Sequence, residues 1–207
     1  MSLPRRSGVT VDQIERLPLF LLHSVLFPGQ RLPLRVFETR YMDVISASLR
    51  NNSPFGICLI RRGQEVGEVA EPVTVGTLAR IERWEMRQSG VLEILVGGGR
   101  RFEIRALHLC GRLNMADVSP WDGEIAMTFP SEFQPLATIA RQLVRDYGGE
   151  ACSEPHRFED ADWVGMRLAQ LLPFANGVKQ TLLEEQDPLR RLAAIKVSLE
   201  DMAKART

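Results

Sequence analysis

Apolar and polar positions divide the chain into a first half patterned for strands and a second half patterned for helices. Residues 17–22 are almost uniformly apolar, which is typical of a strand covered on both faces. After a turn at Pro28-Gly29, residues 31–37 alternate, and Pro33 falls on the polar face. Because proline has no N–H to donate to a neighbouring strand, we predict that residues 31–37 lie at a sheet edge or carry a bulge.

The apolar spacing changes to a helical period after residue 39, where Tyr41, Ile45 and Leu49 follow one another every four residues. Strand patterns then return in four segments, at 55–61, 73–87, 91–96 and 109–118. In the second of these, the inward positions change from odd to even numbers between Ile81 and Trp84. That change of phase predicts a β-bulge between the two residues.

Three consecutive glycines, Gly97 to Gly99, separate the strand at 91–96 from a further alternating stretch at 102–106. Glycines in this position permit the bulge or sharp corner that a closing barrel needs. The run from Gly97 to Arg101 is superficially similar to a phosphate-binding loop, because backbone N–H groups and a guanidinium bind anions. It lacks the lysine and the strand-to-helix context of that motif, so we predict a bend.

Beyond residue 121 the apolar positions follow a helical period. Four amphipathic segments are predicted, at about 135–147, 162–172, 177–185 and 188–202. Gly148-Gly149 and Pro173 end the first two, and Asp187-Pro188 supplies an N-cap and a first-turn proline for the last. Helices this short are marginal alone, so we expect their apolar faces to pack together as a small bundle.

Successive strands with one early helix favour an antiparallel, barrel-like sheet. We therefore predict an α+β fold that is mainly β in its first half and ends in a small α-helical bundle. The predicted division places the β module at residues 1–120 and the helical bundle at residues 121–207.

The composition is that of an ordinary globular protein, and its 26 basic and 26 acidic side chains argue against a strong polyanion binder. Cys58, Cys110 and Cys152 are far apart and lack CxxC spacing, so we expect reduced, structural thiols and no metal or cofactor. The first residues contain no apolar stretch as long as that of a signal peptide, and no window approaches a membrane helix. We therefore expect a cytoplasmic protein.

Short motifs recur in a characteristic order along the chain. They are LPLF at 17–20, VLFPG at 25–29, LPLRVFETRY at 32–41, VGT at 75–77, G-x-x-R-F at 98–102, LAQLLP at 168–173 and VKQTLLEEQDPLRRL at 178–192. In this order they resemble the amino-terminal domain of the bacterial Lon ATP-dependent protease, over nearly the whole chain. The resemblance implies a PUA-like antiparallel β-barrel joined to a helical bundle, with a role in substrate recognition and assembly.

Neither a G-x-x-x-x-G-K-[ST] phosphate loop nor a peptidase domain with its serine and lysine is present in the sequence, so we expect no catalytic activity. The resemblance therefore implies a non-catalytic polypeptide-binding protein connected with protein quality control or proteolysis. Its expected partners are unfolded or exposed hydrophobic segments. The sequence leaves open whether a separate protease or chaperone receives them and whether the chain forms a homodimer.

Four residues are candidates for contacting such segments, namely Phe27, Pro33, Trp84 and Met86. Pro33 marks a predicted edge strand, to which an extended segment can be added by main-chain hydrogen bonds. Tryptophan and methionine suit adaptable apolar contacts. Phe27 fits either an exposed loop tip or the core beneath a hairpin turn, and we favour the core.

The other motif residues are expected to be structural. They are Pro28, Gly29, Glu38, Arg40, Tyr41, Gly98, Arg101 and Phe102. A polar recognition site formed by Glu38, Arg40, Tyr41 and Arg101 is the alternative, but charged groups near a barrel corner more often pair with one another.

Residue types in the chain raise two alternative functions, RNA binding and cysteine-dependent hydrolysis. All 16 basic residues among residues 1–120 are arginines, and PUA-like modules elsewhere bind RNA, so RNA binding through the arginines of residues 80–105 is the alternative function. Alternation with Glu82 and Glu85 is more typical of a solvated strand face than of a phosphate track, so nucleic acid is not the favoured partner. A hydrolase would need an imidazole beside a cysteine thiol, and no spacing in the sequence places such a pair together.

Overall fold

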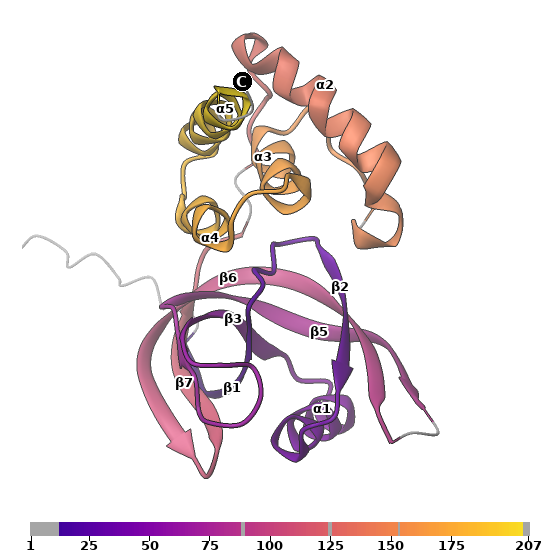
Figure 1. The fold of residues 1–207 in the computed structure, drawn as a ribbon, viewed down its shortest axis with the longest axis vertical. Coiled ribbons are helices and arrows are strands. Elements are labelled where there is room, and N and C mark those ends of the chain that lie inside the picture. Colours follow the sequence, from indigo (N-terminus) through magenta and orange to yellow (C-terminus); the bar gives the residue numbers. More distant parts are fainter. Residues whose placement is uncertain (1–12, 88–89, 124–125, 153, 205–207) are drawn as a thin grey trace, which may run out of the picture.

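The computed structural model of the chain describes residues 13–87, 90–123, 126–152 and 154–204. It has the predicted α+β fold, in which a β-barrel carries one helix at one end and a group of helices at the other (Figure 1). The strands are β1 (Ile14–Leu22), β2 (Arg31–Val36), β3 (Phe55–Arg62), β4 (Glu71–Pro72), β5 (Val75–Met86), β6 (Leu92–Cys110) and β7 (Leu113–Pro120).

The helices confirm the predicted early helix and the later helical half. They are α1 (Thr39–Asn51), α2 (Gln134–Leu143), α3 (Ala161–Leu171), α4 (Asn176–Glu184) and α5 (Pro188–Lys204). A 3-10 turn at Ser131–Phe133 precedes α2, and a π-helical turn at Val144–Gly148 and a 3-10 turn at Gly149–Ala151 follow it. At the start of α5, Asp187 Oδ1 accepts a hydrogen bond of 2.8 Å from Leu189 N–H, as the predicted N-cap requires.

The sheet closes on itself. Neighbouring strands follow the order β1-β7-β6-β5-β3, and β1 pairs with β3 to complete the ring. The pairings in this ring are antiparallel except for β1 with β3, which are parallel because β2 and α1 form a crossover between them. The predicted antiparallel, barrel-like sheet is confirmed, with one parallel pair that the pattern did not reveal.

Strand β6 pairs with β5 along one side, and its partner on the other side changes at the glycine run. Its residues up to Gly97 pair with β2, and its residues from Phe102 onward pair with β7. The backbones are in close contact here, since Gly29 N–H donates to Gly98 O at 2.8 Å, and a Cβ at Gly98 would clash with the carbonyl oxygen of Phe27. The glycine run therefore lies within a strand and not at a helix N-terminus, as predicted for a bend.

The predicted bulge in β5 is confirmed, because its register with β6 shifts between Ile81 and Arg83. One extra residue at this point reverses the parity of inward positions along β5. Trp84 and Met86 consequently share a face with Ile81 although their numbers are even.

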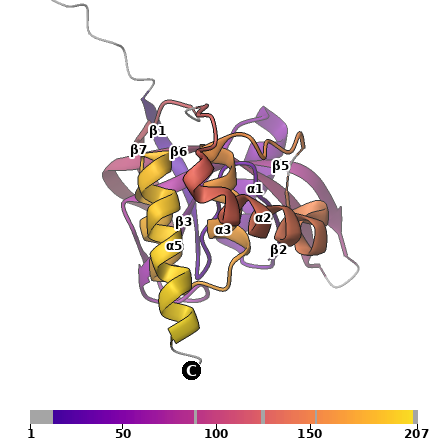
Figure 2. The same cartoon turned by 90° about the horizontal axis from the view of Figure 1, so that it is seen from above.

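The largest apolar cluster joins the barrel to the helices. Val25, Phe27, Leu59 and Val75 of the barrel half lie in the same buried cluster as the apolar faces of α2 to α5. Figure 2, which looks from above, shows α2, α3 and α5 lying over the barrel. Because this core belongs to both halves, the division of the chain into modules at residue 120 stays a prediction.

Candidate functional site

Three strand segments form an open ribbon at one side of the barrel. They are β2, residues 92–97 of β6 and residues 80–86 of β5, and they are referred to below as the ribbon. β6 lies at its centre and β2 at one edge. Strand β3 pairs with β5 only as far as Ala79, so the following residues of β5 form the second edge. In Figure 1, β5 and β6 project beyond the body of the barrel.

Trp84 and Met86 lie on the inner face of the ribbon, which packs against α1. Trp84 is opposite Ile94 and Met86 is opposite Leu92 in the ladder, and residues directly opposite each other share a face. Ile94 and Leu92 are buried in the cluster that includes α1, whereas the side chains of Trp84 and Met86 are 55% and 50% exposed. The ribbon thus extends a buried apolar face into solvent at its β5 edge.

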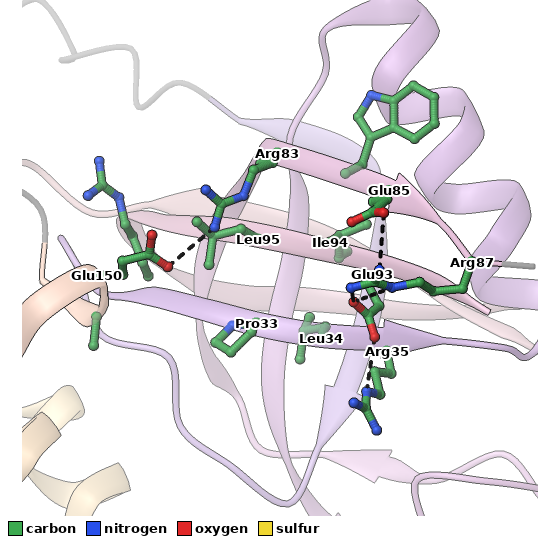
Figure 3. Close-up of a pocket in the computed structure, with 13 residues that line it drawn as sticks. Pro33, Leu34, Arg35, Arg83, Glu85, Arg87, Glu93, Ile94, Leu95 and Glu150 are labelled. Carbon is green, nitrogen blue, oxygen red and sulfur yellow. Dashed lines mark hydrogen bonds and ion pairs between the residues drawn. The ribbon is translucent and has the colours of Figure 1, made fainter.

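Pro33 lies on the opposite, outer face of the ribbon. It is opposite Leu95, which is in turn opposite Arg83. A groove of about 950 Å³ covers this face, bounded by the three strands and by Glu150 and Ala151. Figure 3 shows its labelled side chains coming from all three strands and from the segment after α2. The side chains of Pro33 and Trp84 therefore lie on opposite faces of the ribbon, although both residues contribute to the lining of the groove.

Ion pairs engage the charged groups of the outer face. Arg87 Nη2 lies 2.7 Å from Glu93 Oε2, and this hydrogen bond holds the pKa of Glu93 below its ordinary value. Arg83 Nη2 lies 3.3 Å from Glu150 Oε2 and links the ribbon to the turn after α2. Carboxylates therefore neutralise arginines that a phosphate backbone would need as free cations.

The β2 edge lacks a main-chain donor at Pro33. Gly98 N–H donates to Gln30 O, and the alternation of an antiparallel ladder then directs the backbone nitrogen of Pro33 away from β6. Proline is tolerated there because no ladder bond is lost. The prediction that Pro33 marks an edge strand is confirmed.

Phe27 is not available at the surface. Its side chain is 0% exposed and lies in the cluster between barrel and helices, so the prediction that it contacts bound segments is wrong. The turn after it is held down on both sides. Pro28 O accepts a hydrogen bond from Arg167 Nη2, and Gly29, with φ of 70°, bonds to Gly98. The favoured alternative, a core aromatic beneath a turn, is what the structure has.

The motif residues at the start of α1 form one structural cluster. Arg40 donates to the backbone oxygens of Glu65 and Arg112, each at 3.1 Å, and pairs with Glu38 at 3.1 Å. Its guanidinium lies 4.7 Å from the ring centroid of Tyr41, and burial raises the pKa of that phenol. These groups fix the path of the chain around α1.

Arg101 belongs to the other end of the barrel. Its Nη1 donates to Leu183 O and to Glu185 O, each at 2.8 Å, and its guanidinium lies 4.7 Å from the ring centroid of Trp121. It therefore satisfies the carboxyl end of α4, whereas α1 lies at the far end of the barrel (Figure 1). The structure does not bring Arg101 together with the cluster of Glu38, Arg40 and Tyr41. Phe102 beside it is fully buried inside the barrel.

Iodoacetamide at neutral pH is expected to label Cys110 and to spare Cys58 and Cys152 in the folded protein. Cys58 is buried and its burial raises the pKa of the thiol, while the Sγ of Cys152 is buried against Gln170 Oε1 at 3.8 Å. Cys110 is exposed at the end of β6. Peptide mass spectrometry measures this pattern, with labelling of all three thiols in urea as the control. Rapid labelling of either buried thiol would contradict their structural role.

Within the described ranges, no group of three or more His, Cys, Asp or Glu side chains is placed to hold a metal ion. Among the described helices, none combines the length and the apolar character required to cross a membrane.

His108 lies two residues before Cys110 on β6, and its Nε2 is 2.8 Å from Asp117 Oδ2. The imidazole is thus engaged by a carboxylate.

A family model for the substrate-binding domain of ATP-dependent protease La (Lon) matches residues 16–201. The chain belongs to the Lon substrate-binding domain family. Lon protease 1 of Hydrogenovibrio crunogenus is 25% identical over 192 residues, which cover 84% of this chain and 23% of that protein. The Lon protease of Parabacteroides distasonis is 28% identical over 152 residues, covering 70% and 18%. The chain thus spans less than a quarter of the length of these relatives.

Solved structures of Lon amino-terminal domains share the fold. A Lon N-terminal domain protein from Xanthomonas campestris matches with a TM-score of 0.76 and 36% identity, covering 89% of this chain and 98% of that one. The N-terminal domain of a Lon protease from the Mycobacterium avium complex matches with a TM-score of 0.59 and 19% identity, covering 87% and 96%. The second likeness concerns the fold alone.

Proposed function

We propose that this Lon-type domain binds unfolded or extended segments of other proteins and does not change them covalently. The observation that carries the proposal is the exposure of Trp84 and Met86, two large apolar side chains at the open β5 edge of the ribbon. Membership of the substrate-binding family supports it. Exposed apolar groups beside a strand edge bind many sequences, because they make few demands on the geometry of the bound side chains.

Replacing both Trp84 and Met86 with alanine is expected to weaken binding of a permanently unfolded polypeptide at least about tenfold. Each side chain is about half-exposed, so burying the remainder against a bound segment contributes about half of the roughly 1.5 to 3 kcal/mol of full burial, and losing both contributions suffices for this change. Fluorescence anisotropy of the labelled polypeptide measures the affinity. Because both side chains are half-exposed, we expect the urea midpoint of unfolding to change little.

A matched control variant replaces Leu107 and Leu109 with alanine. These two large apolar residues are 45% and 59% exposed, but they lie on the β6-β7 hairpin away from the ribbon. Unchanged affinity in this control, with loss in the Trp84 and Met86 variant, supports the proposal. Equal affinity of both variants and the parent protein would refute the assignment to the ribbon.

RNA binding through the arginines of residues 80–105 stays the alternative prediction. Its test is a labelled mixed-sequence RNA in the same assay at two salt concentrations, where phosphate binding would weaken steeply with added salt. The ion pairs of Arg83 and Arg87 favour the polypeptide over RNA. A cytoplasmic location also stays a prediction, and the questions of a separate protease or chaperone as partner and of a homodimer stay open.

A further inference from the structure

The free edge of β5 carries main-chain donors and acceptors beside the two exposed apolar side chains. Arg87 N–H donates to Val91 O at 2.9 Å, and Glu85 continues the same ladder register toward β6. In an antiparallel ladder the backbone groups of alternate residues point to opposite sides. Trp84 and Met86 therefore direct their N–H and C=O groups away from β6, and no described strand pairs with them on that side.

Charged side chains often protect a sheet edge from pairing with another strand. Here the charged residues Glu82 and Arg83 form ion pairs on the outer face of the ribbon instead. Glu82 Oε2 lies 2.7 Å from Arg31 Nε on the far edge of the ribbon, a path that a Cβ at Gly97 would block. Arg83 is held by Glu150 on the same face. These ion pairs leave the backbone of the β5 edge uncovered.

The opposite edge of the ribbon is less suited to an incoming strand. There, Arg31, Pro33 and Arg35 direct their backbone nitrogens outward, and the middle one of the three has no hydrogen to donate. Trp84 and Met86 keep their donors at the equivalent outward positions of β5. The outward donors of β2 are therefore interrupted at Pro33, whereas β5 offers an incoming strand two consecutive outward donors without a gap.

We propose that the polypeptide bound by this domain adds a strand to the free edge of β5, with main-chain hydrogen bonds to Trp84 and Met86. This inference rests on the proposed function and specifies how the segment is held. Residues of an added antiparallel strand that lie opposite Trp84 and Met86 share their face, so large apolar side chains are required only at every second position. The intervening side chains of the added strand face the outer, charged side of the ribbon, where polar residues are tolerated.

A short fluorescent peptide that alternates leucine and threonine provides the test, with anisotropy as the readout. Two derivatives carry backbone N-methyl groups, one on three leucines and the other on three threonines, so each controls for the other. Because only alternate N–H groups face the edge of an added strand, one derivative should bind at least about tenfold more weakly and the other within about twofold of the parent peptide. Loss in the leucine set identifies an antiparallel strand, and loss in the threonine set a parallel one.

Equal loss in both derivatives, or in neither, overturns strand addition and leaves polypeptide binding standing. A parent peptide that fails to bind while an unfolded protein binds also overturns strand addition alone. Failure of both the peptide and the unfolded protein to bind overturns the proposed function as well.

A pair of variants at Met86 tests the same bond from the protein side. Met86→Ala removes the side chain only, whereas Met86→Pro also removes the N–H that points to the free edge. We expect the proline variant to bind the peptide about tenfold more weakly than the alanine variant. Equal affinities would contradict a bond from Met86. Circular dichroism verifies folding, and if the proline variant does not fold, the methylated peptides decide the question.

Discussion

Replacing Arg191 with leucine is expected to lower the free energy of unfolding by about 3–5 kcal/mol. Arg191 Nη1 lies 2.5 Å from Asp162 Oδ1, and the two side chains are 0% and 2% exposed. Its Nε also donates to Leu182 O at 3.0 Å, at the carboxyl end of α4. Removing the guanidinium leaves a buried carboxylate without its cation and a helix end without a donor. Urea unfolding followed by circular dichroism measures the loss.

The adjacent Arg190 provides the control for that variant. Its side chain is 78% exposed and its Nε lies 3.8 Å from Asp187 Oδ2, so Arg190→Leu should change stability by no more than about 0.5 kcal/mol. Combining Arg191→Leu with Asp162→Leu should recover part of the loss, because the orphaned charge is then absent. A loss below about 1 kcal/mol for Arg191→Leu alone would contradict the buried pair.

Phe27→Ala is expected to destabilise the protein by about 3–5 kcal/mol, as for other fully buried phenylalanines. The ring is 0% exposed and belongs to the cluster shared by barrel and helices, so its removal leaves a cavity at their junction. Thermal or urea unfolding measures this effect. Since the ring is inaccessible, we expect the affinity for unfolded polypeptide to be kept wherever the variant is folded.

Phe37 serves as the comparison, because it lies just after β2 and is 60% exposed. Phe37→Ala should change stability by no more than about 0.5 kcal/mol. If Phe27→Ala were as stable as Phe37→Ala and had lost affinity for polypeptide, Phe27 would be part of the binding surface and not of the core.

Much of the fold could be predicted from the sequence, because it depends on the chemistry of neighbouring residues. The bulge in β5 follows from a parity change between Ile81 and Trp84, and the start of α5 follows from Asp187 next to a proline. Both signals come from residues within a few positions of the structure that they specify. Pro33 likewise predicts an edge strand, because a proline in a central strand would break the ladder.

Features that depend on contacts between distant parts of the chain could not be predicted from the local sequence pattern. The parallel pairing of β1 with β3 depends on the course of an intervening crossover, and the open edge at Trp84 depends on where β3 stops. Arginine is typical of exposed positions, but Arg191 is buried in an ion pair with Asp162, which lies 29 positions away in the sequence. Glu150 bounds the outer groove only because the turn after α2 folds back toward β2. These outcomes are properties of packing and not of local pattern.

The core shared by barrel and helices also has a consequence for the order in which the protein is made. Val25, Phe27, Leu59 and Val75 are synthesised long before the helices that cover them. At about 5–20 residues per second, residues 121–207 follow the last strand over roughly 4–17 s. During that interval the emerging barrel carries an uncovered apolar end.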